Sequence, residues 1–307
     1  MRQFLACALM FTSLSTQAQE TVDGSFINQF QYRSMAEWQP GMQFMVEPPS
    51  IHNLSIEIDL VPYQSKNLTT LRLMQSDYQG KLFLFTGTEI RKIERCVEDD
   101  CNRTFLIFES DGKKYEYSSF FSMGAIKEFS EASVSGLVYY DEIEKCREML
   151  VGKKIWVLDA PWRSDDMDKA KPMGKYLPVT VTSVGIGTQD GPVKIRFKAE
   201  GYEGEYFVNA RISGINKATG EFGTEFAKAF SFEDPKTEFT EINYTYWHQI
   251  QHRKVANGMG KKECALSWGK PDKISSSRTN DEEIETWSYG LSRSVTFRNG
   301  TVESFVD

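Results

Sequence analysis

The sequence of 307 residues predicts a mainly β protein with a small α+β domain at its C-terminal end. Short runs of aromatic and β-branched residues alternate with glycine-containing turns, which is typical of antiparallel sheets. The order of these runs is repeated once along the chain. From Glu241 to Asp307 the pattern changes to two helical runs followed by three strand-like runs. We therefore expect two tandem, small antiparallel β-barrel-like units followed by a two-helix, three-strand module.

The chain begins with the features of a secretory signal. Arg2 gives a positive start, an apolar stretch covers 4–14, and a Thr-Gln-Ala sequence supplies small residues for signal peptidase at 16–18. We expect residues 1–18 to be removed and the mature protein to be exported, either periplasmic or secreted, with association with the membrane as an open alternative. A buried N-terminal helix is one alternative. Lipid modification of Cys7 is another, but too few apolar residues precede it.

The composition is that of an acidic chain with enough hydrophobic residues to form packed hydrophobic cores. Hydrophobic residues make up 40% of it, and its formal net charge is −7. Charges of both signs are interspersed, which argues against general nucleic-acid binding. No segment after the signal approaches the ~20 apolar residues of a membrane helix. The sequence therefore predicts no nucleic-acid partner and no transmembrane segment.

The first β-rich unit, residues 19–145, contains a candidate disulfide. Cys96 and Cys101 bracket the sequence CVEDDC between two strand-like runs. A bridge across this hairpin tip would stabilise the fold by about 2 kcal/mol in the chain-entropy model, and export would allow it to form. A metal half-site is the alternative, although no second cysteine pair or histidine cluster completes it. Cys146 and Cys264 either pair or stay buried as small apolar residues.

The second unit, residues 146–240, repeats the organisation of the first. In both units a glycine precedes an aromatic strand, in EWQPGMQFMV and in REMLVGKKIWVL. A later strand–turn–strand pattern aligns Phe108 with Phe197 and Tyr115 with Tyr206. Two copies of about 90 residues indicate a tandem duplication. Two unrelated meanders with a similar pattern are the alternative.

A helical connector and a barrel are expected around the start of the second unit. Residues 133–150 contain many helix formers and one apolar face, which predicts a helix between the two units. Residues 150–214 resemble the bacterial Src-homology-3-type barrel in the order of strands and loops. This resemblance implies a groove for an extended peptide beside the long polar loop.

The polar loop and the aromatic residues near it form the candidate ligand surface, which consists of Trp156, Trp162, Asp165, Asp166 and Tyr176. The loop's aspartates, with Asp168, are also a candidate calcium loop. They lack the full ligand spacing and the distal glutamate of such loops. A solvated acidic loop and aromatic core packing are the alternatives.

The third unit, residues 241–307, opens with two expected helices. The first covers 241–255 and ends at Gly258, as a left-handed residue would end it. The second covers 261–268 and ends at Gly269. Three strands follow, EIETWSYG, SVTFRNG and TVESFVD, and an Asn-Gly turn joins the last two.

Two histidines provide the weak metal candidate of the chain. His248 and His252 are four residues apart on the first of these helices, so both imidazoles lie on one face and could hold zinc or copper. No glutamate follows His248 as a metalloprotease motif requires. An exposed histidine pair is the alternative, and the sequence predicts neither a metal nor a cofactor.

Short sequences in the third unit resemble the SmpA/OmlA family of outer-membrane assembly lipoproteins. The matching phrases are Gly258-Met259, Glu263-Cys264, Gly269-Lys270-Pro271-Asp272 and Trp287-Ser288-Tyr289. The resemblance implies two helices on a three-stranded antiparallel sheet and a surface that binds other proteins, without catalytic residues. The chain departs from the family at Gly260, where threonine usually caps the helix, and at Cys264, where an aliphatic residue is usual.

These observations favour an exported, non-enzymatic binding or scaffold protein of a bacterial cell envelope. Its partner would be an envelope protein, a peptide or a wall polymer. Two alternatives remain open, namely an exported hydrolase acting on wall or peptide substrates, and an assembly factor for outer-membrane proteins. The hydrolase needs acidic and basic groups that converge in one cleft, which the sequence does not display.

Overall fold

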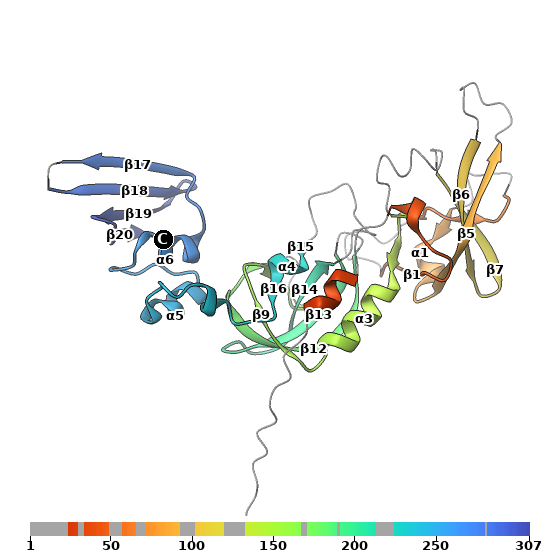
Figure 1. Ribbon diagram of the computed structural model, residues 1–307, viewed down its shortest axis with the longest axis horizontal. Helices are drawn as coiled ribbons and strands as arrows, with labels where there is room; N and C mark the ends of the chain where they lie inside the picture. The colour runs from red at the N-terminus through yellow and green to blue at the C-terminus, as the bar shows by residue number, and fades with distance from the viewer. Residues whose placement is uncertain are drawn as a thin grey trace, which may run out of the picture.

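The computed structural model describes residues 24–29, 34–48, 57–65, 72–92, 102–119, 133–166, 171–188, 191–212, 224–279 and 281–307. The fold is mainly β, as predicted, and three β-rich units follow one another in a row (Figure 1). The buried side chains of the described residues form three hydrophobic clusters. The expected signal segment and the candidate disulfide of Cys96 and Cys101 lie outside the described residues.

The first unit is a six-stranded sheet with the order β3-β7-β6-β5-β1-β8. Its strands are β1 (Gln43–Val46), β3 (Val61–Pro62), β5 (Leu82–Lys92), β6 (Asn102–Ser110), β7 (Lys113–Ser118) and β8 (Leu137–Tyr139). The small elements around it are η2 (Met35–Glu37), β2 (Glu57–Ile58), β4 (Leu73–Met74) and α1 (Gln75–Tyr78). Alternation builds the core, because Phe83 and Phe85 are buried while Leu82 and Leu84 on the other face are exposed.

The second unit is a six-stranded sheet with the order β15-β14-β13-β12-β9-β16. Its strands are β9 (Lys154–Val157), β12 (Leu177–Thr188), β13 (Gly191–Ala199), β14 (Tyr206–Arg211), β15 (Thr224–Glu225) and β16 (Phe230–Ser231), and β10 (Pro161–Trp162) pairs with β11 (Lys171–Pro172). The other elements are η1 (Gly24–Gln29), α3 (Tyr140–Leu150), α4 (Phe226–Ala229) and η3 (Pro235–Glu238). The helix α3 is shorter than the expected connector of 133–150, because Leu137–Tyr139 form the strand β8 of the first sheet instead. The apolar face of α3 is buried in the core of the second unit.

The central strands of the two units match in order, direction and register. The strands β1-β5-β6-β7 and β9-β12-β13-β14 are antiparallel meanders. A later strand pairs with the first strand of each meander, β8 with β1 and β16 with β9. Phe108 faces Tyr115 in the first meander, and Phe197 faces Tyr206 in the second. These are the residues that the sequence aligned with one another.

Local irregularities are shared as well. The N–H of Gly41 donates to the carbonyl of Phe85, and the N–H of Gly152 donates to the carbonyl of Val181, both at 2.9 Å. In each hairpin the register shifts directly after this acceptor residue. Bulges are conserved within families, so a bulge and a glycine hydrogen bond at the same position are expected of two repeats with a common origin. The shared features therefore favour tandem duplication over the alternative.

We expect Gly152→Ala to lower the free energy of unfolding by about 1–2 kcal/mol, because an alanine is strained at positive φ. Gly152 has a φ of +79°, and a Cβ added there meets no atom within 4 Å, so the cost comes from the backbone. Urea denaturation of the mature protein measures the effect. Gly185→Ala is the matched control, because this glycine has equal space and no positive φ. Equal stability of the two variants would contradict the prediction.

The third unit packs two helices against a four-stranded antiparallel sheet with the order β17-β18-β19-β20. Its elements are η4 (Tyr244–Tyr246), α5 (Trp247–Gln251), α6 (Lys261–Trp268), β17 (Lys273–Arg278), β18 (Glu283–Tyr289), β19 (Arg293–Arg298) and β20 (Thr301–Val306). The helix α6 and the last three strands lie where the sequence predicts them. Asn299 and Gly300 both have positive φ, as the predicted tight turn requires. The strand β17 is additional, so the sheet has four strands and not the expected three.

The first predicted helix of this unit is shorter than expected. We expected it to cover 241–255 and to end at Gly258, but α5 ends at Gln251. Arg253 takes the left-handed conformation directly after α5, with a φ of +55°, and Gly258 has the positive φ expected of it, +87°, but lies beyond the end of the helix. This conformation is uncommon for a residue with a side chain. Arg253 therefore marks a position at which tertiary contacts determine the backbone.

Candidate functional site

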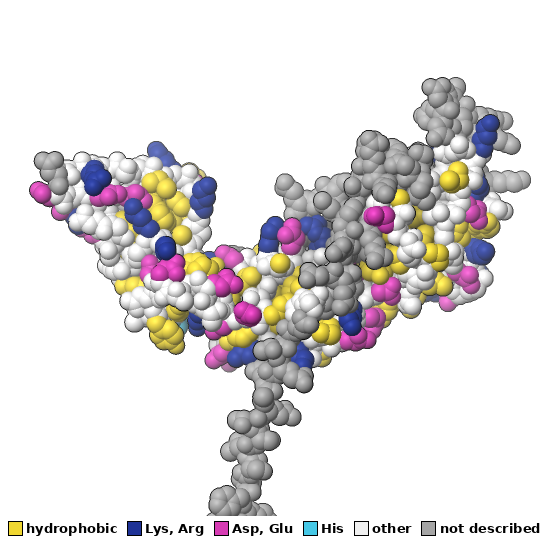
Figure 2. Space-filling model, viewed as in Figure 1, with side chains coloured by type: hydrophobic (Ala, Val, Ile, Leu, Met, Phe, Trp, Pro, Cys, Tyr) yellow, Lys and Arg dark blue, Asp and Glu magenta, His cyan; other side chains and the backbone are white. Residues whose placement is uncertain are grey.

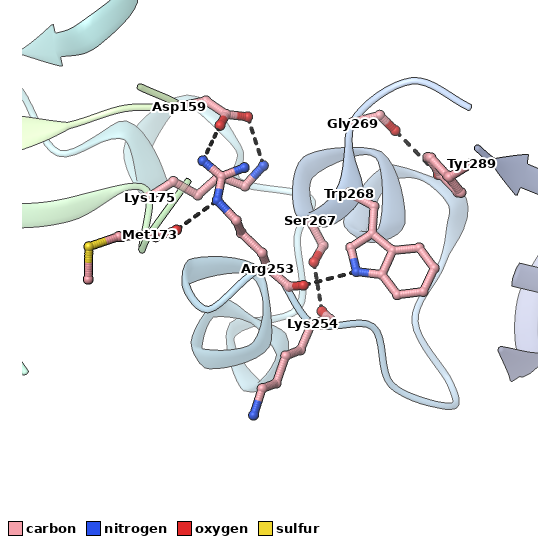
Figure 3. A network of polar contacts seen from close by, with 9 residues as sticks. All are labelled: Asp159, Met173, Lys175, Arg253, Lys254, Ser267, Trp268, Gly269 and Tyr289. Carbon is pink, nitrogen blue, oxygen red and sulfur yellow. Dashed lines mark hydrogen bonds and ion pairs between the residues drawn. The ribbon is translucent and has the colours of Figure 1, made fainter. Parts of the chain in front are cut away.

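A network of polar contacts lies between the second and third units, and we call it the joint. It is built on Asp159, Lys175 and Arg253 (Figure 3). The ammonium group of Lys175 lies 3.0 Å from one carboxylate oxygen of Asp159, and the guanidinium of Arg253 contacts the other. The Nε of Arg253 also donates to the carbonyl of Met173, at 2.7 Å. One arginine of the third unit is thus held by two loops of the second.

Arg253 also belongs to the packing of its own unit. Its carbonyl accepts a hydrogen bond of 2.9 Å from the indole N–H of Trp268 on α6. The hydroxyl of Ser267 donates to the carbonyl of Lys254, at 2.7 Å. The left-handed backbone at Arg253 therefore lets the carbonyl face α6 while the side chain reaches the second unit, as Figure 3 shows.

Backbone and aromatic contacts continue the joint. The N–H of Lys175 donates to the carbonyl of Gln251 at 3.0 Å, and the side-chain amide of Gln251 donates to the carbonyl of Tyr176 at 2.9 Å. The ring of Tyr176 packs edge-to-face against Phe239 and Trp247, with ring centroids 6.1 and 6.0 Å away. Such aromatic pairs add to the burial of apolar area. The joint thus combines charge pairs, backbone hydrogen bonds and a shared aromatic cluster.

Burial determines the electrostatics of the joint. The side chain of Lys175 is 1% exposed, and this burial lowers its pKa, although the charge of Asp159 opposes the shift. Burial alone would raise the pKa of Asp159, but the charges and hydrogen bonds of Lys175 and Arg253 outweigh it, and the pKa is lowered. The charges of Lys175 and Asp159 therefore compensate each other within the joint. This arrangement is suited to fixing two units in one orientation.

The expected ligand surface is divided among separate places. Trp162 is completely buried, and its ring packs against Phe197, Tyr202 and Tyr206 in the core of the second unit. It is a core residue, which differs from the expectation of a surface ring. Trp156 is half-buried on β9, with the ammonium of Lys154 5.8 Å from its ring. Tyr176 belongs to the joint instead.

The aspartates of the polar loop do not converge with these rings. Asp165 forms a two-pronged ion pair with Arg196, at 2.8 and 2.9 Å, and lies 3.8 Å from Lys194. The hydrogen bonds from Arg196 lower the pKa of Asp165. Asp166 is exposed, and Asp168 lies outside the described residues. Because both carboxylate oxygens of Asp165 face an arginine, this geometry does not favour calcium binding.

The histidine pair lies on one face, as the spacing predicts. The ring centroids of His248 and His252 are 4.4 Å apart, and both residues are exposed. The Nδ1 of His252 is 2.8 Å from the carbonyl oxygen of His248, so this nitrogen is engaged. Within the described ranges, no cluster of three or more histidine, cysteine or acidic residues surrounds a common point. Metal binding at this pair stays a prediction.

The cysteines Cys146 and Cys264 do not pair with each other, which excludes one of the two sequence-based alternatives. Both thiols are free and buried. Burial raises the pKa of Cys264 to about 12 and also raises that of Cys146. They therefore act as small apolar core residues.

Sequence reasoning identified Tyr176 as a candidate, in a different role, but did not identify the charged residues of the joint. Lys175 and Arg253 are charged residues in segments next to turns, and such residues are usually solvated. Nothing in their local sequence indicates that they meet Asp159. The one weak sequence signal for the joint is the cluster of aromatic residues from Phe239 to Trp247, because such a cluster is expected to pack against another part of the protein.

The chain matches no family model, no curated protein and no solved structure. The resemblances to the SmpA/OmlA family and to the Src-homology-3-type barrel therefore stay predictions. The helices in the described part of the chain are too short or too polar to cross a membrane.

Proposed function

We propose that the protein is an exported, non-enzymatic binding or scaffold protein of the bacterial cell envelope, which recognises a protein, a peptide or a wall polymer. The joint is the observation that supports this proposal. A scaffold must keep its binding surfaces at a defined distance and orientation. Charge pairs of a buried lysine and an arginine with one carboxylate favour a single arrangement of two units, because other arrangements leave buried charge unpaired.

The row of units is a second support. Three cores in succession give the molecule a long surface for its size (Figure 1). The face seen in Figure 2 carries basic and acidic side chains interspersed on all three units. Mixed charge over an extended surface suits recognition of large partners better than capture of one small molecule.

Affinity capture tests the proposal. The tagged precursor is expressed in a bacterial host, and mass spectrometry of the exported form should show cleavage after Ala18. The immobilised mature protein should then retain a specific envelope protein or wall fragment. Binding should be saturable when it is repeated with the purified component.

Enzymatic turnover of a wall or peptide substrate would contradict the proposal. If the mature protein releases soluble fragments from purified wall or peptide substrates, the hydrolase alternative holds. Arg253→Ala is the informative variant, because it loosens the joint while leaving the surfaces of both units in place. A partner that contacts both units should bind this variant more weakly, whereas a partner of one unit should bind it equally well.

A further inference from the structure

The edge strand β17 is the feature on which we build one further inference. It is the first strand in the order of the third sheet, and it pairs only with β18. The opposite edge is partly covered, because the N–H of Gly258 donates to the carbonyl of Val302, and Val302 donates back to Met259. No described backbone group bonds to the outer side of β17. Figure 1 shows this strand as the outermost element of its unit.

The middle of this edge lacks the features that usually block strand addition. Proteins protect such edges with proline, bulges or charged side chains, lysine above all. The strand β17 has no proline and no bulge, since its register with β18 is continuous, and its two charged residues stand at its ends in the sequence KISSSR. All six residues are exposed. Six residues are also about the length of one ordinary strand.

Two unpaired cations determine what this edge can accept. Lys273 and Arg278 stand at its two ends, and neither forms an ion pair with any described residue. Three neighbouring carboxylates are engaged elsewhere. Glu283, which lies opposite Arg278 in the sheet, is 3.8 Å from the ammonium of Lys261. Glu282 pairs with Arg298 at 2.6 Å, and Asp272 accepts from the N–H of Gly290. The ends of β17 therefore attract acidic side chains.

The same charges disfavour a second copy of the chain. If two β17 strands paired antiparallel over their full length, Lys273 of each copy would lie opposite Arg278 of the other. Like charges directly opposite each other are destabilising in a sheet. The occupant is thus better matched by another sequence than by β17 itself.

We propose that β17 binds an extended peptide segment with acidic residues at both ends, which adds to the sheet as an antiparallel fifth strand. Ile274 is 55% exposed and lies opposite Trp287, on the face that carries the helices. The partner residue opposite Ile274 is therefore apolar. Read from its N-terminus, the segment has an acid opposite Arg278, three small residues, an apolar residue and a second acid opposite Lys273. This inference rests on the proposed binding function and specifies the class of ligand.

A labelled peptide with the core Glu-Thr-Ser-Thr-Val-Glu tests the proposal with the full mature protein. Fluorescence anisotropy should show saturable binding. The double variant Lys273→Glu/Arg278→Glu should bind this peptide at least about tenfold more weakly and should instead prefer a Lys-Thr-Ser-Thr-Val-Lys peptide. Both positions are exposed, so the fold should be retained, which circular dichroism checks.

Hydrogen exchange distinguishes strand addition from simple charge attraction. The acidic peptide should slow amide exchange within 273–278, because the outer backbone groups become hydrogen-bonded. Binding without this protection overturns the proposal, as does equal affinity of both peptides for the double variant. If the protein instead formed concentration-dependent dimers with slowed amide exchange at β17, the occupant of this edge would be a second copy of the chain and not a peptide. Each of these failures leaves the proposed binding function standing if affinity capture still retains a partner.

Discussion

Replacing Trp162 with alanine should lower the free energy of unfolding by about 3–5 kcal/mol, the usual cost of removing a buried tryptophan side chain. The side chain is fully buried, and three aromatic rings surround it with centroids 5.1 to 5.5 Å away. Removal of the ring leaves a cavity that cannot close easily, because the hydrogen-bonded strands around it are fixed in place. Chemical denaturation followed by far-ultraviolet circular dichroism measures the loss.

Trp162→Phe is the matched control. It keeps an aromatic ring in the cavity and removes an indole N–H that is buried without a hydrogen-bond partner among the described residues. We expect a cost below about 2 kcal/mol, because the lost volume is offset in part by removal of the unpaired donor. If Trp162→Ala were as stable as the wild type, the ring would lie at the surface, as the candidate ligand site assumed.

Local patterns predicted the meanders and α6 because their signals are contained in short stretches of sequence. The alternation in β13 reports which face is buried, and Gly269 with the following proline reports where α6 ends. The strand β17 carries no such signal. Its sequence has one apolar residue in six, and its position follows only from pairing with β18.

The candidate ligand surface could not be predicted for a different reason. Trp162 and Tyr176 are neighbours in the same loop region, yet they enter two different cores. Which core an aromatic ring joins depends on contacts with residues that are distant in sequence. Arg253 and Asp159 illustrate this, because they are 94 positions apart and meet only when two units dock.

Removing the carboxylate of the joint should have the second large effect. Asp159→Ala leaves the buried ammonium of Lys175 without its partner and removes one anchor of Arg253. Breaking a buried ion pair costs about 3–5 kcal/mol. We expect about 2–3 kcal/mol here, because the Asp159 side chain is 47% exposed and water replaces part of the lost interaction. Urea denaturation at neutral pH should show the loss.

The double variant Asp159→Ala/Lys175→Met separates unpaired charge from lost packing. It removes the buried ammonium as well, so it should recover most of the stability that Asp159→Ala loses. No recovery would mean that the contacts of Arg253 with Asp159 carry the effect, and Arg253→Ala would then match the single variant.

The pH dependence provides an independent check, and its sign follows from the lowered pKa values. Because the pKa of Asp159 is lower in the folded state, its contribution is full above the ordinary carboxyl pKa of about 4 and is lost as pH falls through the folded value. The difference between wild type and Asp159→Ala should therefore shrink in acid. It should also shrink toward pH ~10, because the unpaired Lys175 of the variant releases its proton more readily in the folded state than in the unfolded state. A difference that stays constant from acid to alkali would show that Asp159 and Lys175 do not act as a charge pair.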